Sequence, residues 1–129
     1  MQKSIDEAAR ILMDSKLTIA LTGAGISVES GIPDFRSAEG LWATYDPAEY
    51  ATIQAFRSDP EKVWHMLREM DEVVGRAKPN EAHTGMGELE QMGCLHCVIT
   101  QNVDNLHQAG GSREFIEYHG NSITHTSLW

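Results

Sequence analysis

The sequence predicts an α/β protein built on a parallel sheet, and two observations support this. Three short apolar runs lie at 17–22, 96–100 and 114–118, and the stretches between them carry helical periodicity. Strands that alternate with helices in this way form parallel sheets with right-handed crossover connections. At 129 residues the chain is long enough for one core of moderate size.

The elements begin with an amphipathic helix over residues 4–14, followed by a strand at 17–22. The helix is indicated by apolar residues at helical spacing, namely Ile5, Ala8, Ala9, Ile11 and Leu12. The run LTIALT at 17–22 suits a strand that is buried on both faces of the sheet. A glycine-containing turn comes next, with a brief helix expected over 26–30 and a long irregular loop over 31–45.

Three helices are expected between this loop and the second strand. An Asp-Pro pair starts the first at 46–56 and the second at 59–77, because aspartate caps a helix and proline fits its first position. Asn80 caps the third helix, and Gly93 ends it. After the strand at 96–100, the stretch VDNLHQAG predicts a short helix that precedes the last strand.

Composition narrows the possible functions. The chain has 10 Lys and Arg against 19 Asp and Glu, a balance of −9 that would repel a nucleic-acid backbone. No apolar stretch approaches the length of a membrane span, and the N-terminal segment carries charges that a signal peptide lacks. Two cysteines without an export signal favour a reducing compartment. We therefore expect no nucleic-acid partner, no membrane partner and a cytoplasmic location.

The turn after the first strand is a candidate phosphate-binding loop. Gly23, Ala24 and Gly25 form a GxG, but Val28 stands where the dinucleotide fingerprint has its third glycine. The alternative is a simple tight turn between a strand and a helix. Free N–H groups in such a loop attract phosphate oxygens, and Ser27 could either cap the following helix or bond a phosphate.

The segment GIPDFR at 31–36 offers several chemical groups together. Pro33 fixes the backbone path, while Asp34, Phe35 and Arg36 supply a carboxylate, an aromatic ring and a cation. One interpretation is a turn with a surface ion pair. In the other, Arg36 binds a pyrophosphate or carboxylate and Phe35 covers a planar ring.

Polar residues also follow the second and third strands. Gln101, Asn102 and Asp104 come directly after 96–100, and His119 follows the third strand. Ligands of open parallel sheets bind at the carboxyl ends of the strands, where these residues are expected. An N-cap role is the alternative for Asn102 and Asp104. An imidazole can accept a proton from a hydroxyl, which is the chemistry that His119 would offer.

Together, TGAGISVESGIPDFR at 22–36, TQNVDNLH at 100–107 and the YHGN that follows resemble the sirtuins, the NAD-dependent protein-lysine deacylases. The resemblance implies a Rossmann-like parallel sheet, with 1–129 as a partial NAD-binding catalytic domain. It implies NAD as cofactor and acetylated protein lysine as partner, giving lysine, nicotinamide and O-acetyl-ADP-ribose. The implied catalytic residues are His119 and Asn102. The implied cofactor-binding residues are Gly23, Ala24, Gly25, Ser27, Ile32, Pro33, Asp34, Phe35, Arg36, Gln101, Asn102, Val103, Asp104 and His119.

The resemblance also implies a role for individual residues. Arg36 would contact cofactor phosphate or ribose, and Phe35 would screen the reactive ribose carbon from the leaving nicotinamide. Val103 and Asp104 would hold the nicotinamide carboxamide, while Gln101 and Asn102 would face the nicotinamide ribose. A general base in the place of His119 would activate a ribose hydroxyl.

The chain departs from the family pattern after HGN. Sirtuins continue into a zinc module with two CxxC pairs and then into further strands, whereas this sequence reads NSITHTSLW. Zinc, expected for the family, has no ligand set here, because Cys94 and Cys97 supply only two of about four ligands. We therefore expect no metal site and two small apolar cysteines. We also expect a truncated sirtuin whose exposed sheet edge mediates self-association.

Two alternatives stay open at this point. One is a catalytically inactive fragment that binds nucleotide or acts as an interaction partner. The other is a sirtuin-type ADP-ribosyltransferase, which would use the same cofactor residues. Among sirtuins, a Tyr and an Arg three residues apart go with acidic acyl groups. Leu67 and Met70 stand at the corresponding positions, which favours small neutral acyl groups such as acetyl.

Overall fold

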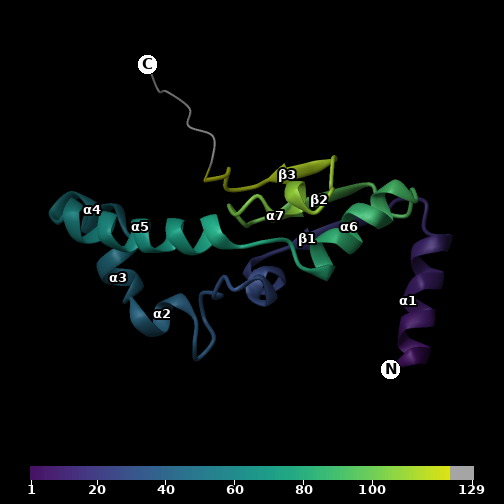
Figure 1. Ribbon diagram of the computed structural model, residues 1–129, viewed down its shortest axis with the longest axis horizontal. Coiled ribbons are helices and arrows are strands. Elements are labelled where there is room, and N and C mark those ends of the chain that lie inside the picture. The colour runs from purple at the N-terminus through teal and green to yellow at the C-terminus, as the bar shows by residue number, and fades with distance from the viewer. Residues whose placement is uncertain (123–129) are drawn as a thin grey trace, which may run out of the picture. The chain divides into compact units, whose positions relative to one another are not determined.

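The computed structural model describes residues 1–122, and it contains a three-stranded parallel sheet (Figure 1). The strands are β1 (Ile19–Thr22), β2 (Cys97–Thr100) and β3 (Phe115–Glu117), in the order β1-β2-β3. Both strand pairs are parallel, so the predicted α/β fold with a parallel sheet is confirmed. The chain divides into two compact units. We call Met1–Gly23 with the residues from Pro79 onward the sheet unit, and Ala24–Lys78 the helical unit.

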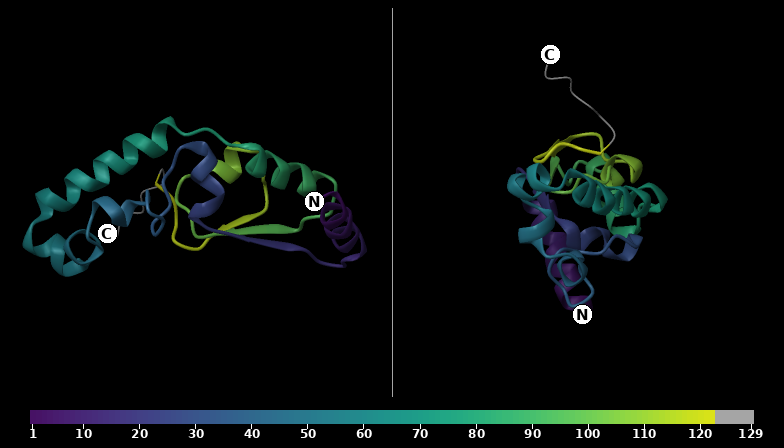
Figure 2. Two further views of the ribbon diagram at one scale, coloured as in Figure 1. Left: turned by 90° about the horizontal axis from the view of Figure 1, so that it is seen from below. Right: turned by 90° about the vertical axis from the view of Figure 1, so that its left-hand side faces the viewer.

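Three helices belong to the sheet unit: α1 (Gln2–Asp14), α6 (Glu81–Gln91) and α7 (Leu106–Ala109). The left view of Figure 2 shows α6 and α7 on one side of the strands. Hydrogen bonds attach α7 to both outer strands, one between His107 Nε2 and the Thr22 hydroxyl at 2.9 Å and one from the Gln108 amide to Glu117 at 2.5 Å. The covered face of the sheet is therefore the one toward α7.

The strand register explains which side chains lie on the covered face. Thr22 pairs with Thr100 across β1 and β2, and both side chains are buried. Val98, two residues before Thr100 on β2, is fully buried. Because side chains alternate between the faces of a strand, these residues share one face. Leu95 and Leu106 are buried as well and complete the described core of the sheet unit.

The opposite face of the sheet is open within residues 1–122. Leu21 pairs with Ile99, and Ile99 pairs with Ile116. Leu21 is 72% exposed and Ile116 53% exposed. The expectation that the first strand is buried on both faces is therefore wrong for the described chain. A parallel strand loses water on both faces only when helices cover both, and here one layer is present.

Helix α1 is amphipathic as predicted, but it buries no residue. Ile5 is 53% exposed and Ile11 58% exposed, so the apolar side of α1 has no packing partner among the described residues. At the start of α6, the predicted cap is confirmed. The side chain of Asn80 accepts from the backbone N–H of Ala82 at 2.9 Å, and the backbone N–H of Asn80 donates to His83 Nδ1 at 3.3 Å.

The helical unit begins with the 3-10 helix η1 (Ala24–Ser30) and continues with four α-helices. They are α2 (Leu41–Thr44), α3 (Pro47–Tyr50), α4 (Ile53–Ser58) and α5 (Pro60–Arg76). The helix predicted at 46–56 is wrong in extent, since α3 ends at Tyr50 and a new helix starts at Ile53. Thr52 causes this break, because its hydroxyl accepts from the backbone N–H of Ala55 at 3.0 Å and caps α4.

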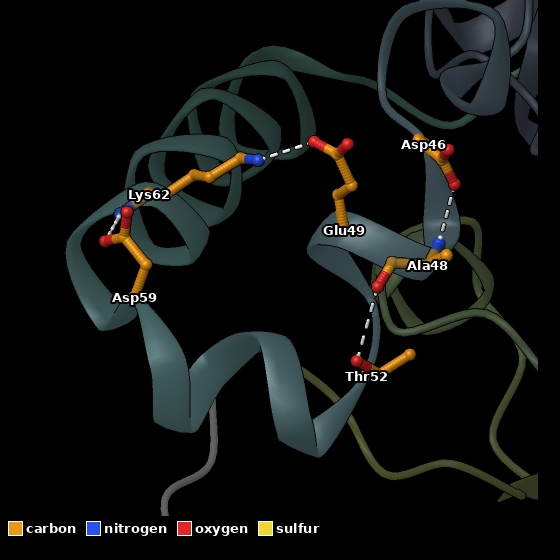
Figure 3. A network of polar contacts seen from close by, with 6 residues as sticks. All are labelled: Asp46, Ala48, Glu49, Thr52, Asp59 and Lys62. Atoms are coloured by element: carbon orange, nitrogen blue, oxygen red, sulfur yellow. Dashed lines mark hydrogen bonds and ion pairs between the residues drawn. The ribbon is translucent and has the colours of Figure 1, made fainter.

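Figure 3 shows how caps and an ion pair hold the short helices of this unit. Asp46 accepts from the backbone N–H of Ala48 at 2.8 Å and Asp59 from that of Lys62 at 3.0 Å, which confirms both predicted caps. The Lys62 ammonium pairs with Glu49 at 2.6 Å and lies over the Tyr50 ring, so α5 is tied to α3. None of the helices in the described part of the chain is long and apolar enough to cross a membrane.

Candidate functional site

In the sheet unit, the predicted residues at the ends of β1 and β2 form one hydrogen-bonded group. The backbone N–H of Gln101 donates to the carbonyl of Thr22 at 3.0 Å. The side-chain amide of Asn102 donates to the carbonyl of Gly23 at 3.2 Å. The backbone N–H of Asn102 donates to the Thr100 hydroxyl at 3.1 Å. The polar stretch after β2 is thus fixed against the glycine turn that follows β1.

His119 joins this group from the end of β3. The backbone N–H of Tyr118 donates to the carbonyl of Thr100 at 2.9 Å, which carries the chain past the end of β2. Nδ1 of His119 then lies 3.1 Å from the carbonyl oxygen of Gln101. A carbonyl only accepts, so Nδ1 carries the hydrogen and Nε2 carries the lone pair in the neutral ring. His119 is exposed, and it can therefore accept a proton from a ligand at Nε2.

Asp104 lies one residue before Asn105, the N-cap of α7, so the predicted N-cap alternative is wrong for Asp104. Its carboxylate accepts from the backbone N–H of Leu106 at 3.0 Å, at the start of α7. Asn105 between them takes a left-handed conformation with φ of 61°. The side-chain amide of Asn102 instead donates to the Gly23 carbonyl, at the end of β1. Val103, next to Asp104, is 37% exposed.

Two buried histidines lie in the sheet unit as well, and no pattern in the sequence indicates a function for them. His83 on α6 and His107 on α7 are 0% and 1% exposed, and their ring centres are 5.0 Å apart. Burial lowers the pKa of His83. Burial lowers the pKa of His107 as well, and the neighbouring His83 lowers it further, while Asp104 acts in the opposite direction on both. Both rings are therefore held in the neutral form.

In the helical unit, the predicted phosphate loop continues into η1. A Cβ added at Gly25 would meet no atom within 4 Å, so a ligand can approach the backbone there. Ser27 is fully buried, and its carbonyl accepts from the backbone N–H of Ile32 at 3.3 Å. Gly31 has a φ of 84°, a left-handed conformation that favours glycine at this turn. The brief helix expected at 26–30 is confirmed as part of η1.

Asp34 forms the turn of the first interpretation of GIPDFR, but the ion pair expected with that turn is absent among the described residues. Its carboxylate accepts from the backbone N–H of Ser37 at 3.1 Å and from the Ser37 hydroxyl at 2.5 Å. Phe35 is 44% exposed, and its ring lies 5.4 Å from that of Trp42. Arg36 is exposed beside it. Phe35 and Arg36 are thus available to a ligand, whereas Asp34 is engaged within its own loop.

Ile32 and Pro33 line a largely apolar cavity of about 250 Å³ between the loop and α5. Its other lining residues include Leu41, Met70 and Val73. At its polar side the Tyr45 hydroxyl donates to the Glu69 carboxylate, which raises the pKa of Tyr45. The expectation of an irregular loop over 31–45 is wrong in part, since Leu41–Thr44 form the helix α2. Residues of α2 line one side of this cavity.

The two cysteines do not form a reactive or metal-binding pair in this structure. Both are free and partly buried. Burial raises the pKa of the Cys97 thiol, and Glu114 and Glu90 add to this, so the thiolate is disfavoured. Among the residues described, no group of three or more His, Cys, Asp or Glu side chains could hold a metal ion. The residues present do not fit the structural zinc of the family.

Comparison with known proteins agrees with this architecture. A profile of the Sir2 family matches residues 23–127. The chain belongs to the Sir2 family. An NAD-dependent protein deacylase of Thermococcus sibiricus is 51% identical over 117 residues, which are 91% of this chain and 46% of that protein. The chain thus spans about half the length of the Sir2 relatives that it matches.

Solved Sir2 structures resemble the same part of the fold. A mutant Sir2 homologue in complex with ADP-ribose superposes with a TM-score of 0.85 at 51% identity, covering 89% of this chain and 46% of its own. A Sir2 complex with a p53 peptide and NAD+ gives a TM-score of 0.78 at 44% identity, with coverages of 89% and 45%. The predicted sirtuin-type fold is confirmed by these likenesses.

The structure brings together those of the predicted residues that belong to the sheet unit. Gly23, Gln101, Asn102 and His119 are hydrogen-bonded neighbours in the sheet unit. The predicted residues from Ala24 to Arg36 belong to the helical unit. Trp42, the ring partner of Phe35, could not be predicted, because aromatic contacts within an aperiodic loop leave no spacing pattern.

Proposed function

We propose that this chain carries the nicotinamide-side residues of an NAD-dependent protein-lysine deacetylase. The main support is the hydrogen bond between His119 Nδ1 and the Gln101 carbonyl, which directs the basic lone pair of the ring to Nε2. Proton removal by a positioned imidazole is the chemistry that such an enzyme requires. Family membership and the names of the relatives support the choice of NAD and of acylated lysine.

Several features of this chain fit a bound dinucleotide. A Cβ added at Gly23 or Gly25 would meet no atom within 4 Å, so phosphate or ribose oxygens can approach either backbone segment. Val103 and Asp104 would hold the nicotinamide carboxamide, and Arg36 would contact cofactor phosphate or ribose. Gln101 and Asn102 would face the nicotinamide ribose. When bound, NAD would supply the ribose carbon at which the acyl oxygen replaces nicotinamide.

The residues of the chain would then act as base and as supports. His119 takes the proton of a ribose hydroxyl at Nε2, while its Nδ1–H stays bonded to the Gln101 carbonyl and stabilises the imidazolium that forms. Asn102 is held by the Gly23 carbonyl through its amide nitrogen, which fixes the orientation of its side chain beside the glycine turn. Leu67 and Met70 supply no cation, which favours neutral acyl groups such as acetyl.

The test uses a fusion of residues 1–129 to the part of the Thermococcus sibiricus relative that this chain does not match. We expect the fusion to release nicotinamide from NAD in the presence of an acetylated peptide. His119→Ala should lower deacetylation about 10²–10⁴-fold, the usual contribution of a general base. His65→Ala on α5, whose side chain is 74% exposed, is the matched control and should leave the rate unchanged. Full activity of the His119→Ala fusion would refute the assignment.

A second candidate function is nucleotide binding without catalysis by residues 1–129 alone. It is favoured by the match to about half the length of the relatives. In that case the unfused chain would bind ADP-ribose but show little deacetylation, whereas rapid NAD-dependent deacetylation by the unfused chain would contradict it. An ADP-ribosyltransferase is distinguished by transfer of label from NAD to protein in the same assay.

A further inference from the structure

The loop from Asp34 to Trp42 in the helical unit is closed on itself by its own backbone. The N–H of Leu41 donates to the carbonyl of Asp34 at 2.7 Å, and the N–H of Trp42 donates to the carbonyl of Phe35 at 3.0 Å. The two ends of the loop therefore pair directly. The N–H of Gly40 also donates to the carbonyl of Ser37 at 3.0 Å, which tightens the turn.

Gly40 is required by this closure because the backbones come too close for a side chain. A Cβ at Gly40 would lie 2.7 Å from Asp34 Oδ1, 2.8 Å from the Asp34 carbonyl oxygen and 2.9 Å from the carbonyl carbon of Phe35. Its φ of −75° suits any residue, so space and not conformation demands glycine. Two of the three nearest atoms are backbone, which cannot move aside without opening the loop.

The carboxylate of Asp34 completes this closed loop. Its Oδ1 accepts two hydrogen bonds from Ser37, and the same oxygen is the nearest atom to the added Cβ of Gly40. Asp34 thus holds the tip of the loop through Ser37 and the end of the loop through its carbonyl. The residue directly after it, Phe35, is placed against Trp42 by this arrangement.

We infer that Asp34 and Gly40 are positioning residues that fix Phe35 against Trp42 and set where Arg36 emerges. The inference rests on the proposed function, in which Phe35 and Arg36 meet the cofactor. It changes the role expected for Asp34 from cofactor contact to loop support, because Oδ1 of its carboxylate already accepts two hydrogen bonds from Ser37. The exposed ring of Phe35 and the exposed Arg36 remain the ligand-facing groups.

The first readout needs no cofactor. Of the three tryptophans, Trp64 and Trp129 are replaced by Phe so that emission reports Trp42 alone. Phe35→Ala gives the reference spectrum of Trp42 without its ring partner. Asp34→Ala and Gly40→Ala should shift emission toward that reference, while Asp34→Asn, which keeps an oxygen to accept from Ser37, should not. Ala38→Ser, at the exposed tip, is the matched control.

The second readout is titration of the same 129-residue chains with ADP-ribose. We expect Asp34→Ala to weaken binding about tenfold, the effect of losing a hydrogen bond to a charged group, and Asp34→Asn to stay within about twofold of wild type. Unchanged Trp42 emission in Asp34→Ala would overturn the inference. Equal loss of affinity in Asp34→Asn and Asp34→Ala would also overturn it, because it would indicate direct contact by the charge. If wild type binds no ADP-ribose, the proposed function loses support while the emission readout still decides on the loop.

Discussion

Lowering the pH should destabilise the chain because His83 and His107 are buried in the neutral form. Both have a pKa below the ordinary histidine value in the folded protein, so the unfolded chain binds more protons. Stability then rises with pH and is lost as the pH falls through about 6.5, the unfolded value. Protonation of His83 would also remove the lone pair at Nδ1 that accepts from the Asn80 N–H.

The size of the effect follows from proton linkage. Between pH 7.5 and 5.5, a histidine that stays neutral when folded contributes a loss of about 1.4 kcal/mol in the free energy of unfolding. Two such residues give at most about 2.7 kcal/mol, a large part of the stability of a small domain. Because the rings are 5.0 Å apart, the second proton is resisted more than the first and the pair titrates as one unit.

Urea unfolding at pH 7.5 and 5.5, followed by circular dichroism, measures this loss. His107→Gln keeps a nitrogen or oxygen near the Thr22 hydroxyl and removes one titrating group, so the loss should shrink by at most about 1.4 kcal/mol. His65→Gln on the exposed face of α5 is the control and should leave the loss unchanged. An equal pH dependence in wild type and His107→Gln would refute the argument.

Three further predictions use the same chain or its fusion. Gly87→Ala should destabilise by about 1–3 kcal/mol, because its Cβ would lie 2.8 Å from the Gly110 carbonyl oxygen, whereas Gly75→Ala in α5 meets nothing within 4 Å and should stabilise by about 0.5–1 kcal/mol in urea titrations. In the fusion, Asp104→Asn removes the carboxylate charge and should slow nicotinamide exchange. It keeps an acceptor for the Leu106 N–H, so the melting temperature should stay within a few degrees. An exchange as fast as in wild type would show that Asp104 does not contact nicotinamide. If the open sheet face or its edges mediate self-association, Leu21→Lys should lower the sedimentation-derived mass at high concentration more than Ile53→Lys, a matched exposed site on α4.

Sequence was sufficient where a residue type acts locally. Asp46, Asp59 and Asn80 each accept from the backbone N–H groups that their position before a helix predicts. The three strands could be located because short apolar runs bounded by polar residues are typical of strands in a buried sheet. Their parallel order follows from the helices between them.

The errors have a common physical origin in tertiary context. Nothing in LTIALT distinguishes a strand covered on both faces from one covered on a single face, since the helices that cover a sheet come from other parts of the chain. Thr52 interrupts a helix because its hydroxyl competes for a backbone N–H, an effect weaker than the Asp-Pro signal that precedes it. The close pairing of His83 and His107 joins two helices and has no local spacing.

The hydrogen bond that sets the His119 tautomer ends on a main-chain carbonyl, and every amino acid carries one. The orientation of the His119 ring is therefore a property of the β2–β3 register and does not depend on which side chain stands at position 101. Variants with any residue other than proline at position 101 should keep the lone pair of neutral His119 at Nε2. A comparison of side chains alone would assign no role to this carbonyl acceptor. In other parallel sheets, a histidine oriented in the same way is found by asking which backbone carbonyl the strand register places beside its ring.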